Sequence, residues 1–284
     1  MEHSSRYIVM FAAAVCAVCS IFVAISAVSL KDRQELNARV DVQKKVLALA
    51  DLMGKDERLG NEEILQRFEA SITPRVVNMG TGSYADEIDA TSFDQRVASK
   101  DPDRSRPAPT NLAKVQRLPS HGLVYHVQKD GKLSSLVLPI EGYGLWGTLY
   151  GFIALAPDAR TIRGITFYEH KETPGLGGEV ENPRWVGLWP GRLAFDDNWD
   201  VSIRVKKGAA GPPESDPYQV DGLSGATITS RGVTNMLAFW LGDDGFGPYL
   251  EQYRASRSVT RSGASGARDE AKGRPVGSIA ARSI

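Results

Sequence analysis

Two glycine-rich stretches of this 284-residue chain hold the residue types that could do chemistry. The later one, residues 221–227 (DGLSGAT), lies directly before a helix that the apolar spacing predicts after Gly225. The first N–H groups of a helix point outward at the positive end of its dipole, where a phosphate group binds. Gly225 and Ala226 would let a phosphate approach the backbone, and Ser224 and Thr227 carry hydroxyls. This stretch is therefore a candidate phosphate site.

The same residues also fit a purely structural role, as a tight turn whose hydroxyl caps the helix. The earlier stretch, residues 169–178 (EHKETPGLGG), fits neither the G-x-G-x-x-G nucleotide fingerprint nor a P-loop. It reads equally well as a glycine-rich surface loop. From the residues alone, both stretches keep a functional and a structural interpretation.

The composition of the chain narrows the chemistry. Its 34 basic and 34 acidic residues balance, which argues against a nucleic-acid partner. The two cysteines, Cys16 and Cys19, stand in an apolar segment, where packing and a redox pair are both conceivable roles. The four histidines show no metal-ligand spacing, so no metal site is expected. Any redox function would therefore require an organic cofactor.

An uncharged apolar run over residues 7–30 is the strongest local signal in the chain. As a helix it is long enough to cross a bilayer. A cleaved signal peptide is the alternative, but the run exceeds the apolar core of about 7–15 residues that such signals carry. We expect an uncleaved anchor. Its orientation stays open, because Arg6 stands on one side and Lys31, Arg33 and Arg39 on the other.

The rest of the chain is predicted to form an α+β domain with a mixed sheet, flanking helices and no internal repeats. The anchor continues as a stalk helix that ends at Gly54, and Asn61 caps a short helix over residues 62–68. Residues 80–120 read as loop, and the polar, basic tail over residues 254–284 reads as disordered. Strand patterns cover residues 74–79, 123–127, 133–138, 145–156, 161–170 and 201–205, and further helices follow Asn182 and Gly225.

The stretch from Asp221 to Thr227 matches in full the D-x-x-[ST]-G-A-T motif, at which a transferase joins FMN through its phosphate to the threonine hydroxyl. Three further segments closely resemble the C subunit of the Na⁺-translocating NADH:quinone reductases. They are residues 144–152 (GLWGTLYGF), 166–179 (TFYEHKETPGLGGE) and 182–185 (NPRW). With a similar anchor, the resemblance extends from about residue 7 to residue 253.

This resemblance implies that Thr227 carries FMN through a phosphoester from its Oγ, while Ser224, Gly225 and Ala226 shape the phosphate turn. Asp221 falls at the position that the transferase recognises. No catalytic residue and no metal ligand is implied. The earlier loop would lie against the isoalloxazine ring through Glu172, Thr173, Gly175, Leu176 and Gly177. Trp146, Tyr168 and Trp185 are candidate neighbours of the ring, with packing in the core as the alternative.

The resemblance also implies a role in a larger machine. The chain would be the electron-carrying subunit of a translocase with subunits A, B, D, E and F, and not a complete enzyme. It would relay electrons from an intramembrane iron–sulfur centre to the next flavin, between NADH and ubiquinone, while the complex exports Na⁺. A flavin transferase would mature it.

The same resemblance implies a topology in the bacterial inner membrane. Residues 1–6 would be cytoplasmic, residues 7–30 would span the membrane, and the remainder would be periplasmic. The periplasmic part divides into a stalk helix and N-terminal part of the domain over residues 31–120, an FMN-binding core over residues 121–253, and the tail over residues 254–284.

Two alternatives stay open. The G subunit of an Rnf-type electron-transport complex shares the anchor and the D-x-x-[ST]-G-A-T motif, although residues 144–151 and 182–185 favour the quinone reductase. A membrane-anchored binding domain without flavin would use residues 224–227 only to cap a helix.

Overall fold

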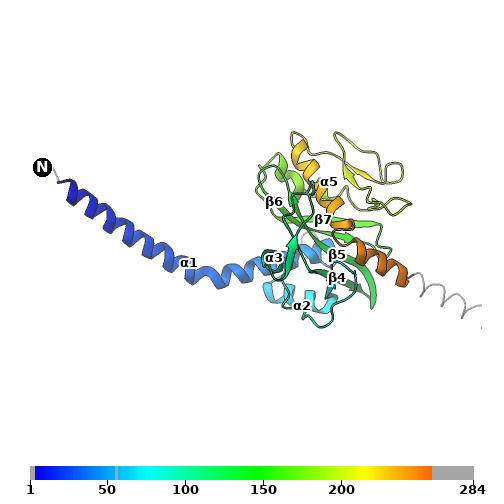
Figure 1. Cartoon of the computed structure of the whole chain (residues 1–284), viewed down its shortest axis with the longest axis horizontal. Coiled ribbons are helices and arrows are strands. Elements are labelled where there is room, and N and C mark those ends of the chain that lie inside the picture. The colour runs from blue at the N-terminus through cyan, green and yellow to red at the C-terminus, as the bar shows by residue number, and fades with distance from the viewer. Residues whose placement is uncertain (1–3, 55–56, 258–284) are drawn as a thin grey trace, which may run out of the picture.

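A computed structural model describes residues 4–54 and 57–257 of the chain. The helix α1 (Ser5–Leu49) has 45 residues and projects far from a domain that contains all other elements (Figure 1). It contains neither glycine nor proline and stays helical throughout, although it bends before it reaches the domain (Figure 1). Its part Ser5–Lys31 is long and apolar enough to cross a membrane, and no part of that apolar window is buried. This is compatible with the expected single-pass anchor.

The other end of α1 differs from the prediction. The helix ends at Leu49 and does not continue to Gly54. Asp51 takes the left-handed conformation, with φ of 54°, and the N–H of Leu52 donates to the carbonyl of Leu47 at 3.0 Å. This Schellman closure usually has glycine at the left-handed position, but Asp is among the few other residues that tolerate it.

The main sheet has five strands, all antiparallel, in the order β1-β4-β5-β6-β7. Asp130 and Gly131 both have positive φ and close the predicted hairpin between β4 and β5. The five strands are β1 (Ile72–Asn78), β4 (His121–Lys129), β5 (Lys132–Tyr143), β6 (Thr148–Leu155) and β7 (Ile162–Glu169). The α+β class is confirmed, and the parallel pairing that was expected in a mixed sheet occurs instead in a separate pair, β8 (Arg204–Val205) with β9 (Gln219–Val220).

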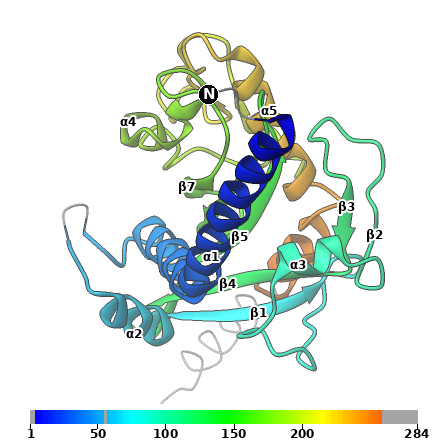
Figure 2. The ribbon, with the colours of Figure 1, turned by 90° about the vertical axis from the view of Figure 1, so that its left-hand side faces the viewer.

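Different helices cover the two faces of the sheet. On one face, α5 (Thr227–Leu241) buries Met236 and Trp240 in the same apolar cluster as Leu138 of β5. On the other face lie the end of α1 and α2 (Asn61–Ser71) (Figure 2). Their Leu47 and Phe68 belong to one apolar cluster with Val137 and Phe152 of the sheet. The anchor helix is therefore part of the folded domain as well as its link to the membrane.

The remaining elements are short. Residues 80–120, expected to be loop, contain α3 (Gln95–Lys100), β2 (Ser105–Pro107) and β3 (Arg117–Pro119). After β7 come the 3₁₀ helix η1 (Gly177–Glu181) and α4 (Pro183–Val186), which Asn182 caps. The strand expected over residues 201–205 is shorter, because only β8 pairs regularly. At α2, Asn61 is the first helical residue and not the predicted cap, and the Glu63 carboxylate accepts from the N–H of Gly60.

A last helix begins at residue 247 and reaches residue 257. Residues 254–257, which the sequence assigned to the disordered tail, are therefore helical. The rest of that tail, residues 258–284, lies outside the described residues, as do residues 1–3 of the expected cytoplasmic segment.

Candidate functional site

Thr227 is the first residue of α5, and its side chain is exposed. The helix is preceded by Ala226, which has no side chain able to cap it, and Ser224 is exposed on the turn before it. Among the described residues, the hydroxyls of Ser224 and Thr227 make no hydrogen bond with the protein. The capping role that the sequence left open for these two hydroxyls is therefore not observed.

The Glu172 carboxylate joins the parts of the site. It is buried, and its Oε1 accepts the N–H groups of Leu145 and Trp146, each at 2.9 Å. Its Oε2 accepts the hydroxyl of the buried Thr229, on the first turn of α5. Glu172 thus holds together the loop after β7, the turn between β5 and β6, and the start of α5. Because its carboxylate points at these donors, Glu172 holds the loop in place and does not face solvent.

Glycines are needed where this carboxylate and the two loops meet. A Cβ atom on Gly144 would lie 2.6 Å from Glu172 Oε1, and one on Gly177 would lie 2.7 Å from Thr229 Oγ1. Gly225 has φ of 69°, and a Cβ there would lie 2.9 Å from Leu176 Cδ2. The two glycine-rich stretches, which are about fifty residues apart in the sequence, are therefore in contact, and neither is a free surface loop.

Apolar side chains remain exposed around this contact. Leu176 is 45% exposed and Ile228, next to Thr227, is 46% exposed. On the turn between β5 and β6, Leu145 is 40% and Trp146 is 63% exposed. We call these four residues the apolar rim. Thr173 and Gly175 are also exposed on the same loop.

The three aromatic candidates separate into two groups. Trp146 is on the apolar rim, contrary to a role in core packing. Trp185 is buried, and its Nε1 donates to the backbone carbonyl of Asp221 at 2.8 Å. Tyr168 stacks on Phe152 on the sheet face that carries α1, with ring centroids 5.2 Å apart. For Trp185 and Tyr168, packing is the observed role.

Asp221 fastens the start of the motif. Its Oδ1 accepts the N–H of Ala210 at 2.8 Å, and the N–H of Gly222 donates to the carbonyl of Gly208 at 2.9 Å. These bonds fix the loop against the turn that contains the exposed Lys206 and Lys207. The structure thus brings together all ten candidate residues in two adjoining loops, with Asp221 at the edge.

Leu145 and Ile228 also belong to the site, although they were not among the candidates, and Thr229, whose hydroxyl the sequence offered for a phosphate or a cap, instead donates to Glu172. Thr229 was visible as a second threonine beside Thr227, but its burial depends on the fold. Within residues 4–54 and 57–257, no group of three or more His, Cys, Asp or Glu side chains could hold a metal ion.

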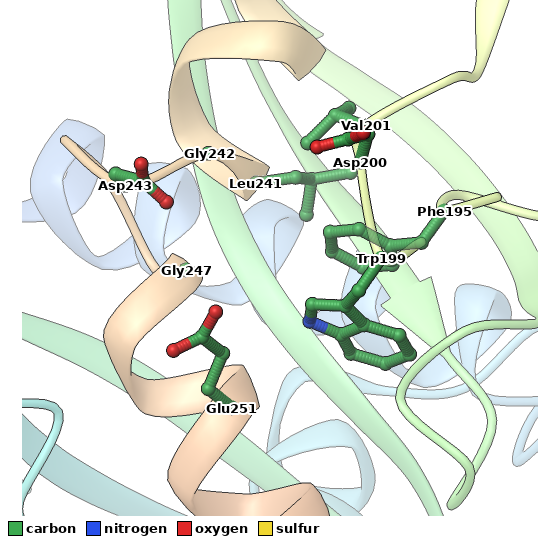
Figure 3. Close-up of a pocket in the computed structure, with 9 residues that line it drawn as sticks. All are labelled: Phe195, Trp199, Asp200, Val201, Leu241, Gly242, Asp243, Gly247 and Glu251. Carbon is green, nitrogen blue, oxygen red and sulfur yellow. The ribbon is translucent and has the colours of Figure 1, made fainter. Parts of the chain in front are cut away.

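A cavity of about 180 Å³ lies at the opposite end of α5 (Figure 3). It is lined by aromatic Phe195 and Trp199 and by the carboxylates of Asp200, Asp243 and Glu251. None of its lining residues belongs to the two loops. Its three carboxylates outnumber the nearby Arg254 guanidinium, which lies 4.0 Å from the Trp199 ring centroid, and this excess of negative charge disfavours a phosphate group. The cavity is therefore distinct from the candidate phosphate site.

Comparison with known protein families places a ligand-binding domain over the same residues. The family model described as FMN-binding domain matches residues 144–242, which include both loops and the whole of α5. The fold and the site thus define the chain as an FMN-binding domain protein with an N-terminal apolar helix.

Relatives over nearly the full length identify the family. The C subunit of the Na(+)-translocating NADH-quinone reductase from Pseudomonas aeruginosa is 43% identical, over 89% of this chain and 97% of its own length. The protein of that name from Vibrio anguillarum is 45% identical, over 84% and 90%. The chain belongs to the family of C subunits of the Na⁺-translocating NADH-quinone reductase.

Two solved structures agree with this assignment. The crystal structure of Shewanella oneidensis NqrC aligns with a TM-score of 0.71 at 38% identity, over 77% of this chain and 99% of that one. The C subunit of the same reductase from Parabacteroides distasonis aligns with a TM-score of 0.61 at 26% identity, over 78% and 96%. The reductase is therefore favoured over the Rnf-type protein and over a flavin-free binding domain.

Proposed function

We propose that Thr227 carries FMN covalently, through a phosphoester from its Oγ, and that the chain relays electrons in a Na⁺-translocating NADH:ubiquinone reductase. The observation that carries this proposal is the setting of Thr227. Its hydroxyl is exposed and makes no hydrogen bond among the described residues, at the first position of a helix and beside the apolar rim.

The phosphate end of the ligand fits the start of α5. The N–H groups of the first helical turn and the positive end of the helix dipole favour an anion next to the Thr227 hydroxyl. Ala226 buries its methyl group and Gly225 has no side chain, so neither residue shields these N–H groups from a ligand. Ser224 adds a second exposed hydroxyl on the same turn.

The ring end fits the apolar rim. Ile228 follows Thr227 on α5, and Leu176 of the earlier loop lies against Gly225, two residues before Thr227. Glu172 fixes the backbone under Leu145 and Trp146. Together they offer a flat, mainly apolar ligand a surface that is already in place. FMN supplies one-electron and two-electron redox chemistry when it is bound, and the chain keeps it attached, oriented and partly dry.

The names of the relatives, which are C subunits of a reductase, imply a complex with other subunits. We propose that these are subunits A, B, D, E and F, and that a flavin transferase attaches the FMN during maturation. The chain would receive electrons from an intramembrane iron–sulfur centre and pass them to the next flavin while the complex exports Na⁺. With α1 in the bacterial inner membrane, the domain would lie in the periplasm and residues 1–6 in the cytoplasm.

The test is the intact mass of the full chain co-expressed with a flavin transferase, followed by peptide mapping. We expect the mass of one FMN less one water, on the tryptic peptide 208–231 that contains Thr227. Fragmentation of this peptide separates Thr227 from Ser224 and Thr229. No added mass, when a known substrate of the same transferase is modified in parallel, would contradict the proposal.

A further inference from the structure

The anchor helix reaches the base of the loop that carries Leu176. Near the end of α1, the Lys45 side chain lies in a partly buried position and its Nζ donates to the carbonyl of Phe167 in β7 at 2.8 Å. The same Nζ lies 3.5 Å from Glu181 Oε1 at the end of η1. One lysine of the membrane anchor therefore contacts the elements on both sides of residues 170–180.

His170 continues this contact into the site. Its Nε2 lies 3.6 Å from Glu181 Oε1, and its Nδ1 accepts the N–H of Glu172 at 3.2 Å. An Nδ1 that accepts a hydrogen bond leaves the ring proton of a neutral histidine on Nε2, which is the atom facing Glu181. Lys45, Glu181 and His170 thus form a polar chain that begins on the anchor helix and ends at the backbone N–H of Glu172, the residue whose carboxylate lies under the apolar rim.

The packing of the residues next to Lys45 fixes the position of α1 relative to this polar chain. The adjacent Val46 and Leu47 are fully buried in the cluster that α1 shares with the sheet. A Cβ on Gly164 of β7 would lie 2.8 Å from Leu49 Cδ1, so helix and strand pack closely. Lys44 is exposed and contributes to none of these contacts within the described part of the chain. The position of the Lys45 ammonium is therefore set by the fold.

We propose that Lys45 is a positioning residue for the flavin: through Glu181 and His170, the membrane anchor helix sets the conformation of residues 172–178 against Thr227. This inference rests on the proposed function, because it assigns the loop's orientation to the flavin on Thr227. The redox properties of that flavin then depend on a residue of the anchor helix.

The experiment uses the full chain in lipid nanodiscs, made with and without the flavin transferase. Lys45→Met removes the charge and the donor at similar length, and Glu181→Gln removes the acceptor charge from an exposed position. Lys45→Arg restores a cation that can reach both acceptors, and Lys44→Met is the matched control. Two quantities are measured, namely amide hydrogen exchange of residues 172–178 and, in the flavinylated protein, the visible circular dichroism and midpoint potential of the flavin.

We expect Lys45→Met and Glu181→Gln each to speed exchange of these amides by about two- to fivefold, as for the loss of a partly exposed ion pair. The flavin dichroism and potential change with them, the Lys45→Met, Glu181→Gln double variant adds little further, and Lys45→Arg restores both quantities. Lys44→Met changes neither.

Unchanged exchange in Lys45→Met and Glu181→Gln would overturn the proposal, and so would faster exchange with an unchanged flavin. Hydrogen exchange on the protein made without flavin tests whether Lys45 affects residues 172–178, and this test does not depend on the proposed flavin. Absence of flavin from the unaltered chain would instead contradict the proposed function alone.

Discussion

The two ends of α5 differ in shape and in charge. At its beginning, Thr227 stands exposed beside the apolar rim, and no carboxylate is directed at it among the described residues, because Glu172 is occupied by its own donors. At its end, the cavity between residues 195–201 and 241–251 is walled by three carboxylates (Figure 3). At the hollow end the carboxylates outnumber the one nearby guanidinium, Arg254, and disfavour a phosphate. The exposed start of the helix favours one.

If FMN is joined to Thr227 as proposed, this difference means that a tethered ligand does not need a deep pocket. A freely exchanging ligand must bury most of its surface to bind, whereas a covalent bond keeps the ligand in place without that burial. The protein then has only to orient the ring and to limit its contact with water. An exposed apolar rim fits that task, and under the proposed function it would leave an edge of the ring accessible to a redox partner.

Substitution of Thr227 should give the largest difference between the two ends of α5. Thr227→Val should abolish covalent FMN completely, because the hydroxyl that forms the ester is gone, while the free energy of unfolding changes by only about 0.5 kcal/mol. Glu251→Gln, at the cavity end of the same helix, should leave full flavin content. The measurement is the protein-bound flavin after denaturing electrophoresis. Flavin that persists on the Thr227→Val chain would show that the tether is elsewhere.

The second largest effect is expected at Glu172. Glu172→Ala leaves two backbone N–H groups and the Thr229 hydroxyl without their acceptor in a buried place, which should cost about 4 kcal/mol of unfolding free energy. The exposed Glu169, paired with Arg96 at 2.7 Å, provides the control. Glu169→Gln should cost less than about 1 kcal/mol. Urea unfolding of the full chain measures both, and equal losses would refute the holding role of Glu172.

Lowering the pH should destabilise the contact between His126 of β4 and the last helix, residues 247–257. Burial, helped by the nearby Arg75, lowers the pKa of His126 from 6.5 to about 4, and its Nε2 is 2.9 Å from the hydroxyl of Tyr249 in the last helix. The unfolded chain therefore takes up this proton first as the pH falls. Stability that is fully present above pH 6.5 should decrease toward pH 4 by up to about 3 kcal/mol.

Urea unfolding between pH 7 and pH 4 measures this decrease, and His126→Gln should flatten it. Hydrogen exchange should show that residues 247–257 loosen before residues 172–178. If the flavin loop opens first on acidification, the assignment of the acid response to His126 is wrong.

The smallest effects are expected from two glycine-to-alanine substitutions in one loop, one opposed by close packing and the other by backbone strain. Gly177→Ala places a methyl group against Glu172 and Thr229 and should cost about 2 kcal/mol. Gly175→Ala meets open space, and only its φ of 75° resists the change, which should cost about 1 kcal/mol. Thermal unfolding of the two variants ranks them. The reverse order would mean that Glu172 and Thr229 can move to accommodate a methyl group at residue 177.

The sequence predicted the parts of the fold that depend on local patterns. The strand patterns of β4, β5 and β7, the apolar run of β6, the Asp130-Gly131 turn and the apolar stripe of α5 each identify an element without knowledge of its neighbours. The end of α1 escaped prediction because Asp51 takes a conformation that usually selects glycine. The short elements within residues 80–120 escaped because their pairing partners are too brief to leave a pattern.

In the candidate site, too, features set by the local sequence were predicted and features set by the folded structure were not. A local motif pointed to residues 221–227, and both loops were recognised before their contact was known. The role of Glu172 could not be predicted, because its donors at residues 145, 146 and 229 meet only in the folded chain. For the same reason the exposure of Trp146 was not predicted, since a tryptophan in an apolar run usually packs in the core.

The uninterrupted course of α1 also sets a working height. From Lys31 to Leu49 the helix rises about 27 Å, at roughly 1.5 Å per residue, with no glycine or proline to act as a hinge. If the apolar part lies in a bilayer, the bent but continuous helix limits how far the domain can lie from the lipid surface (Figure 1). Its encounters with other proteins would then be confined to a layer near the membrane, and under the proposed function a redox partner would have to present its own centre within that layer.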